Sequence, residues 1–337
     1  MKILVRATNW LGDAVMSLPA LRAVRQAYPG AHIAVLARPW VAELYEREPF
    51  ANEIIREAPG FRARLRAAAE VRSRGFDTAI LLPNSFGSAV VARLGGVARR
   101  IGYDRDGRGW LLTDAIKPPL KGEIPPHESL YYLELLRRAG IISVLPEWQP
   151  IQLQGVSESR QRGEALLAQM AVSGPVFGVS PGAQNSRAKQ WSPVRFAEAA
   201  ARIAAARGWT AVLFGSLRER PLCSAICSAL RRRGLPVLSL AGETTLRQFI
   251  DCAAACRVFL TNDSGAMHVA SALCVPTVAV YGPTDWIATA PSGPIARVIR
   301  EPVECSPCML RDCPIDHRCM QRISAEAVAQ AALELVK

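Results

Sequence analysis

The 337-residue sequence lacks any apolar run near the roughly 20 residues that a membrane-spanning helix needs. Its opening stretch, MKILVRA, has an apolar run too short for a signal peptide, and no small-residue cleavage site follows it. Zinc-finger spacing with paired histidines, an aromatic RNA-binding signature and a low-complexity basic tail are all missing. We therefore expect a cytoplasmic protein with no nucleic acid partner.

Two common nucleotide-binding motifs are also missing. No Gly-x-Gly-x-x-Gly follows the leading strand of either half, which argues against a dinucleotide oxidoreductase. The Gly-x4-Gly-Lys-Ser/Thr spacing of a P-loop is absent as well. Half of the residues are hydrophobic and 21% are charged, so a disordered or fibrous chain is excluded.

Negative charge is scarce relative to positive charge. Lys and Arg number 41 against 29 Asp and Glu, which gives a formal net charge of +12. The arginines gather in residues 62–74 and again in residues 99–108. Such a cluster is usually a solvated helix face, but without a nucleic-acid module it favours phosphorylated substrates or an acidic membrane surface as partners.

Short apolar runs rich in β-branched residues alternate with helical stretches along the chain. This alternation predicts an α/β protein with parallel sheets covered by helices on both faces. Helices are expected at residues 14–28, 128–139 and 193–207, among others. The strands are expected at residues 2–7, 32–36, 53–56, 78–82, 175–180, 210–214, 237–239, 258–261 and 277–281.

The length suits two domains rather than one, with a linker in the proline-bearing segment 146–157. We expect an N-terminal domain at residues 1–155 and a C-terminal domain at residues 156–322. A final helix within residues 323–337 is expected to pack back on the first domain. Two such halves form a cleft that the carboxyl ends of their strands line, where open α/β sheets bind ligands.

The segment VFLTNDSGAMH, residues 258–268, has the strongest ligand-binding chemistry. A strand ends at Thr261, and Gly265 lets a ligand approach the backbone where the free amides of a helix start favour a diphosphate. Asp263 is suited to accept sugar or ribose hydroxyls, and His268 lies within the first helical turn. The alternative is that Asp263 or Ser264 only caps the helix. The neighbouring strand end, VYGPTDW, is also polar and favours a ligand site.

A second loop, SPGAQNSRAKQW, follows another strand at residues 180–191. Its small polar residues, with Arg187 and Lys189, are typical of a phosphate clamp, in which Lys acts as a point charge. A solvated Lys is the alternative. Two further turns, GSLRE with Glu219 and GETT with Thr244 and Thr245, end strands and are suited either to ribose or base contacts or to helix capping.

In the first half, TNWLGD follows the first strand and ends at Asp13. A lone carboxylate there is suited to be the general base that deprotonates an acceptor hydroxyl. A helix cap explains the spacing equally well.

Nine cysteines in a cytosolic chain argue against a disulfide framework. Four of them, Cys305, Cys308, Cys313 and Cys319, form a C-x2-C-x4-C-x5-C cluster that contains His317. This spacing is compatible with structural zinc, with reduced thiols or with a local disulfide. We favour no obligatory metal, because a zinc ribbon separates its cysteine pairs by more residues.

These motifs together resemble glycosyltransferase family 9. The shared stretches are GDAVMSLPAL, KQW, NDSGAMHVASA followed by VYGPTD, and the cysteine cluster, and they span nearly the whole chain. Within the family, TNWLGDAVMSLPALRA and the cysteines are most similar to the branch that adds the second heptose of the lipopolysaccharide inner core.

The resemblance implies the GT-B architecture, in which two Rossmann-like domains face each other across a cleft. It implies inverting transfer of L-glycero-D-manno-heptose from ADP-heptose to heptosyl-Kdo2-lipid A, with no metal or other cofactor. The implied partners are the ADP-heptose donor and the lipid A–Kdo–heptose acceptor, with no stable protein partner and with peripheral association at the inner membrane face. Another GT-B transferase with a different sugar nucleotide or acceptor, or a non-catalytic nucleotide-binding protein, remains the alternative.

The resemblance also assigns roles to individual residues. Asp13 corresponds to the catalytic base, and Arg62, Arg64 and Arg66 are expected to meet the anionic acceptor. Where one family branch has Thr-Thr ahead of the lysine, this chain has Gln184 and Asn185. The donor-binding residues implied are Lys189, Asp263, Ser264, Gly265, His268, Glu219, Thr244, Gln184 and Asn185.

Overall fold

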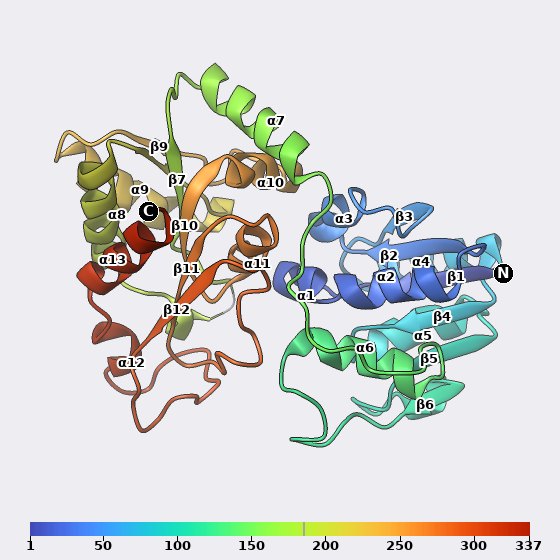
Figure 1. Cartoon of the computed structure of the whole chain (residues 1–337). Coiled ribbons are helices and arrows are strands. Elements are labelled where there is room, and N and C mark those ends of the chain that lie inside the picture. Colours follow the sequence, from blue (N-terminus) through green and yellow to red (C-terminus); the bar gives the residue numbers. More distant parts are fainter. Residues whose placement is uncertain (185) are drawn as a thin grey trace. The chain divides into compact units, whose positions relative to one another are not determined.

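Each half of the chain forms a six-stranded, wholly parallel sheet in this computed structural model (Figure 1). The structure describes residues 1–184 and 186–337. Asn185, one of the expected donor residues, lies outside the described residues. The chain divides into two units, Met1–Gln149 and Pro150–Lys337.

The sheet of the first unit has the strand order β3-β2-β1-β4-β5-β6. Its central strand, β1, pairs in parallel with β2 on one side and with β4 on the other. The strands are β1 (Lys2–Arg6), β2 (His32–Ala37), β3 (Glu53–Arg56), β4 (Thr78–Leu81), β5 (Arg99–Tyr103) and β6 (Asp114–Ile116).

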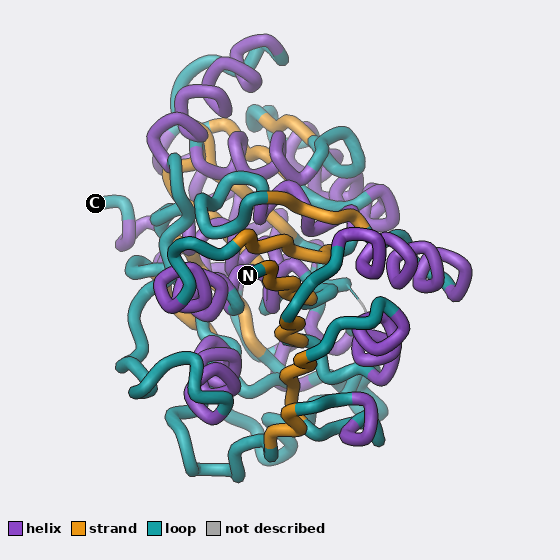
Figure 2. The backbone as a smooth tube through the Cα atoms, turned by 90° about the vertical axis from the view of Figure 1, so that its right-hand side faces the viewer, coloured by secondary structure: helices purple, strands orange, loops and turns teal. Residues whose placement is uncertain are grey.

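Helices cover both faces of this sheet (Figure 2). On one face, Leu4, Leu36 and Leu81 form a buried cluster with α4 and α5. Helices α1, α2, α3 and α6 contact one another in the other helical layer. The helices are α1 (Leu11–Met16), α2 (Leu18–Ala27), α3 (Pro39–Tyr45), α4 (Phe61–Arg74), α5 (Phe86–Leu94) and α6 (Glu128–Arg138), with a 3-10 turn, η1 (Gly109–Leu111).

The first unit differs from the sequence expectation in two places. The single helix expected at residues 14–28 is two helices joined at Ser17, because Pro19 in the first turn of α2 has no N–H to continue α1. The strands β5 and β6 were not expected, since β5 starts with two arginines. The charge of Arg99 in β5 is neutralised by an ion pair with Asp114 of the neighbouring strand β6, in which Nη2 and Oδ1 lie 3.1 Å apart.

The sheet of the second unit has the order β12-β11-β10-β7-β8-β9. Its strands are β7 (Val176–Ser180), β8 (Thr210–Leu213), β9 (Val237–Ser239), β10 (Cys256–Asn262), β11 (Thr277–Tyr281) and β12 (Ala296–Arg300). Its helices are α7 (Val156–Gln169), α8 (Pro193–Arg207), α9 (Arg220–Arg231), α10 (Leu246–Ala254), α11 (Gly265–Ala272), α12 (Arg318–Gln321) and α13 (Ala325–Leu335), with 3-10 turns η2 (Arg187–Lys189) and η3 (Leu217–Glu219).

Alternate strand residues of the second unit point to opposite helical layers. Phe177 and Val179 join the core that α8, α9 and α13 cover. Gly178, between them, lies so close to the ring of Phe259 that a Cβ would overlap it. The final helix α13 buries Val328 and Ala332 in this same core and packs on α8, so by its packing it belongs to the second unit and not to the first.

In both sheets the order of the strands reverses at one point. The chain runs outward from β1 to β3 and then returns to β4 on the other side of β1, and β7 and β10 are related in the same way. Ligands of open α/β sheets bind outside the carboxyl ends of the strands at such a switch point. The loops after β1, β4, β7 and β10 are therefore where a ligand is expected to bind. No helix among the described residues has the length and apolar composition needed to cross a membrane.

Gly163 of α7 lies against the backbone of Asp251 in α10, where a Cβ would overlap the carbonyl oxygen. Gly163→Ala should therefore lower the free energy of unfolding by about 1–3 kcal/mol, although alanine is the better helix former. Denaturant unfolding measures the effect. Gln161→Ala, at an exposed position of the same helix, is the control and should be neutral or slightly stabilising. Stabilisation by Gly163→Ala would contradict the close packing of α7 on α10.

Candidate functional site

Asp263 lies directly after β10, at the switch point of the second unit, and is buried. Its Oδ2 receives two partners: Nζ of Lys189 at 2.8 Å and the hydroxyl of Thr284, which donates at 2.7 Å. The three residues come from the loops after β10, β7 and β11. An ammonium is thus held at the carboxyl edge of the sheet by a buried carboxylate.

The helix-cap alternative for this loop is not observed. Ser264 is the N-cap residue of α11, but its side chain makes no capping bond. Its hydroxyl instead lies 3.1 Å from that of Thr261. Gly265 begins the helix, so the amides of its first turn are oriented toward the same edge as Lys189 and Asp263.

Asn262 joins the loops after β7 and β10, and its role was not expected from the sequence. Its Oδ1 accepts from the backbone N–H of Trp191 at 3.0 Å, and its Nδ2 donates to the carbonyl of Pro181 at 2.7 Å. Asn262 is fully buried. The amide of Asn262, which carries both a donor and an acceptor, was the only hint in the sequence that this residue could join two loops. Which loop it joins can be identified only in the folded chain.

His268 is buried within the first turn of α11, with Nδ1 2.8 Å from the hydroxyl of Ser292. This contact sets the orientation of the ring. Its expected contact with a phosphate stays a prediction.

The other expected donor residues lie at the ends of β7, β8 and β9. Glu219 forms a capping box with Ser216, whose backbone N–H donates to Oε2 at 2.7 Å, while Oε1 lies against Gly182 of the loop after β7. Thr245, not Thr244, caps α10 by accepting from the N–H of Gln248 at 3.2 Å. Gln184 is exposed.

In the first unit, Asp13 lies in the first turn of α1 and is partly buried. The N-cap residue of α1 is Trp10, so Asp13 is not the cap. Its charge acts on α6: burial, together with the negative charge of Asp13, raises the pKa of Glu128 to about 7, against the opposing charge of Arg105. Sequence reasoning did not single out Glu128.

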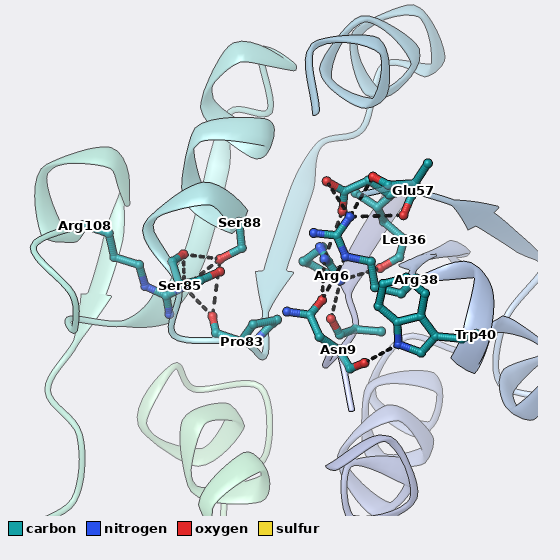
Figure 3. A network of polar contacts seen from close by, with 12 residues as sticks. Arg6, Asn9, Leu36, Arg38, Trp40, Glu57, Pro83, Ser85, Ser88 and Arg108 are labelled. Atoms are coloured by element: carbon teal, nitrogen blue, oxygen red, sulfur yellow. Dashed lines mark hydrogen bonds and ion pairs between the residues drawn. The ribbon is translucent and has the colours of Figure 1, made fainter. Parts of the chain in front are cut away.

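A buried arginine network holds the loops after β1, β2 and β3 together (Figure 3). Arg6 pairs with Glu57 at 2.9 Å, and Arg38 approaches the same carboxylate at 3.6 Å. Both arginines also donate to Oδ1 of Asn9, at 2.8 and 3.3 Å. Burial lowers the pKa of Arg6 to about 10, which Glu57 opposes.

Arg108 has a comparable role at the loop after β4 (Figure 3). It is fully buried, and it donates to the carbonyl of Tyr103 at 3.0 Å and to the hydroxyl of Ser88 at 2.9 Å. Burial lowers its pKa to about 10. This arginine of the 99–108 cluster is therefore structural, not part of a solvated helix face.

The three arginines expected to meet the acceptor do not share a face of α4. Residues two apart on a helix point about 200° apart, so Arg64 is directed away from Arg62 and Arg66. All three are exposed. The guanidinium of Arg64 reaches α5, where Cζ lies 3.1 Å from the Cβ position of Gly87.

The thiols of Cys305, Cys308, Cys313 and Cys319 are free, as are the other five. Burial raises the pKa of Cys319, and Cys305, Cys313 and Cys308 act on it in the same direction. Among the described residues, no three His, Cys, Asp or Glu side chains are arranged to hold a metal ion.

The raised pKa of Glu128 predicts a pH dependence of stability. Its ordinary value is 4.5, so between about pH 4.5 and 7 the folded state keeps a proton that the unfolded state releases. The free energy of unfolding should fall as pH rises through this window, and Glu128→Gln should flatten the profile there. Urea unfolding at several pH values checks this, with exposed Glu164→Gln as the control. An unchanged slope in Glu128→Gln would contradict the raised pKa.

Comparison with known proteins identifies the family of this chain. Residues 64–318 match glycosyltransferase family 9 (heptosyltransferase). The chain is 37% identical over 310 residues to lipopolysaccharide heptosyltransferase 2 of Escherichia coli strain K12, covering 89% of this chain and 88% of that protein. It is 35% identical over 309 residues to the protein of the same name from Salmonella typhimurium strain LT2, with the same coverage.

Among solved structures, E. coli ADP-heptose lipopolysaccharide heptosyltransferase II superimposes with a TM-score of 0.84. The identity is 33%, and the match covers 100% of this chain and 98% of that one. The expected GT-B fold is thereby confirmed. The chain belongs to glycosyltransferase family 9, the heptosyltransferase family, and is a glycosyltransferase.

Proposed function

We propose that this chain transfers L-glycero-D-manno-heptose, with inversion, from ADP-heptose to the first heptose of the lipopolysaccharide inner core. The observation that carries the donor half is the ammonium of Lys189, held by Asp263 beside the first turn of α11 at a switch point. The names of the relatives, lipopolysaccharide heptosyltransferase 2, support the acceptor.

The donor diphosphate would bind at the first turn of α11. The amides from Gly265 onward and the positive end of the helix dipole favour an anion, and Lys189 adds a full charge. A lysine ammonium has three donors, so Lys189 can keep its bond to Asp263 while it contacts a phosphate oxygen. Asp263 would thus orient the cation and face the donor sugar.

The nucleoside would extend along the strand ends that follow. Glu219 uses Oε2 for its capping box, which leaves Oε1, above Gly182, to accept from a ribose hydroxyl. Thr244, next to the capping residue Thr245, and Gln184, which is exposed, would border the nucleotide. Asn185 is assigned there from the family resemblance alone.

The chemical step assigned to Asp13 is proton removal. Its carboxylate would take the proton of the acceptor hydroxyl as that oxygen attacks the anomeric carbon, on the face opposite the leaving ADP. The electrons of the broken bond leave with the diphosphate, where Lys189 and the α11 amides would stabilise the developing charge. No metal is invoked, and none of the residues named here needs one for its role.

Asp13→Asn should separate catalysis from donor binding. The amide has the same shape but accepts no proton, so kcat for heptosyl transfer should fall by about 10²–10⁴-fold while ADP affinity stays within twofold. Lys189→Met should show the opposite pattern, with weaker ADP binding and a raised KM for ADP-heptose. Transfer assays and calorimetry with ADP measure both.

Thermal shifts with ADP, UDP and GDP provide the control for donor identity. ADP and ADP-heptose should stabilise the wild-type protein and UDP and GDP should not, since ligand binding to the folded state raises its stability. Stabilisation by UDP or GDP alone would exclude the ADP-sugar assignment.

For the catalytic step, an unchanged kcat in Asp13→Asn would exclude Asp13 as the general base.

We infer that the lipid acceptor is met by an aromatic–arginine face on the first unit. Phe86 of α5 and Trp110 of η1 lie with ring centroids 6.1 Å apart, and Trp110 is 75% exposed. Phe61 and Leu65, four residues apart on α4, are also exposed. Exposed aromatic residues with arginines are typical of surfaces that bind anionic bilayers. Arg64 lies on the same side, since its guanidinium reaches α5 at Gly87, next to Phe86. The face comprises Phe61, Arg64, Leu65, Phe86 and Trp110, while Arg62 and Arg66 point to another side of α4.

Loss of Trp110 should weaken binding to anionic vesicles. Trp110→Ala and Phe86→Ala should each reduce co-sedimentation with phosphatidylglycerol vesicles several-fold, while binding of the wild type should fall at high salt. The control is Leu217→Ala, which removes an equally exposed apolar side chain, 65% accessible, from the second unit. Equal loss in the control, or no loss in Trp110→Ala, would contradict this face.

A further inference from the structure

The segment that follows β12 and runs into the start of α12 contacts both loops that place partners on Asp263. We call residues 303–319 the strap; it contains the cysteine cluster and His317. One of the two loops ends in Lys189, and the other leads to Thr284. Neither the family resemblance nor the proposed mechanism assigns the strap a role.

At the first loop, the strap holds both backbone polar groups of one residue, Ala188. The backbone N–H of Ala188 donates to the carbonyl of Arg311 at 2.9 Å. The carbonyl of Ala188 lies 2.6 Å from Nε2 of His317, which must carry the ring proton to donate there. Ala188 is buried and directly precedes Lys189. The η2 turn is three residues long, so its orientation depends on contacts from outside.

At the second loop, the strap holds two successive carbonyls. The hydroxyl of Ser306 donates to Gly282 at 2.6 Å, and the backbone N–H of Met309 donates to Pro283 at 2.8 Å. Thr284 follows immediately. Gly282 also lies close to the strap end, since a Cβ there would be 3.0 Å from Sγ of Cys319.

The two loops that the strap contacts each place one residue on the same atom, Oδ2 of Asp263. Lys189 and Thr284 both bind Oδ2 of Asp263, and each is preceded in sequence by backbone that the strap holds. The further ion pair of this region, Arg187 with Asp312 at 2.6 Å, is largely exposed and contributes little. The buried backbone contacts and the side chains of His317 and Ser306 are therefore the main connections.

We propose that the strap positions the ammonium of Lys189 and the hydroxyl of Thr284 for the donor diphosphate, with His317 as the principal positioning residue. This inference rests on the proposed role of Lys189 in donor binding. A rotated η2 turn would displace the ammonium from the first turn of α11 and so weaken the grip on the diphosphate.

The test compares two substitutions at His317. His317→Gln keeps a donor at the same number of bonds from Cβ, while His317→Leu removes it, and both share the left-handed backbone of this residue, φ 56°. His317→Leu should raise the KM for ADP-heptose and the Kd for ADP about tenfold, the value of one lost hydrogen bond. Its kcat at saturating donor should change less than threefold, and His317→Gln should restore near wild-type binding.

Two further variants complete the design. Ser306→Ala removes the side-chain contact to the second loop and should weaken ADP binding in the same way. Ile315→Ala, at an exposed strap position, is the matched control and should bind ADP as the wild type does. Should His317→Leu fail to fold, Ser306→Ala decides the question.

The outcomes separate this inference from the proposed function. Weaker ADP binding in His317→Leu and Ser306→Ala, with rescue by His317→Gln, supports it. Unchanged ADP affinity and donor KM, with only a lowered melting temperature, would overturn it and leave the strap a structural element. If Lys189→Met also leaves ADP affinity unchanged, the proposed donor site itself has failed; if only the strap variants are silent, the donor site stands.

Discussion

The ion pair between Asp263 and Lys189 is the interaction on which the second unit's site depends. A buried carboxylate is costly without compensation, and here Oδ2 is matched by an ammonium and by the hydroxyl of Thr284. Three loops that leave three different strands must meet for this to occur. Asn262 joins two of them through its amide, and the strap joins the third. The polar contacts thus define the geometry of the loops as well as the charge of the site.

In the first unit, the loops at the carboxyl edge of the sheet are joined by arginine side chains instead of a carboxylate and an amide. Its loops at the carboxyl edge are joined by the buried guanidinium groups of Arg6, Arg38 and Arg108, which donate to several backbone carbonyls at once. A guanidinium has five donors in a planar arrangement, so one side chain can hold several loop carbonyls. Part of the positive charge of the chain is therefore structural. The exposed arginines of α4 are among the charges that remain for an anionic partner.

The alternation of strands and helices, the end of β10, and the polar turns after β7, β10 and β11 could be read from the sequence, because period and turn chemistry are local properties. The interruption at Ser17, the strands β5 and β6, and the strand β12 were missed. Two of those strands carry arginines in place of the usual apolar pattern, and only pairing with neighbours makes them strands. The packing of α13 on α8 also could not be read from the sequence, because it depends on which surface of the folded chain the helix meets.

The sequence by itself determined the α/β class, the family, and the residue types that can bind a diphosphate or remove a proton. Those properties follow from local pattern and from the chemistry of single side chains. Only the tertiary structure decided which of them meet. Lys189 and Asp263 are 74 positions apart and His317 is 129 from Ala188, yet each pair is in contact, because parallel sheets gather the ends of distant strands at one edge. The same folding packed α6, with Glu128, against α1, where the charge of Asp13 acts on it, and brought Arg64 against Gly87 of α5.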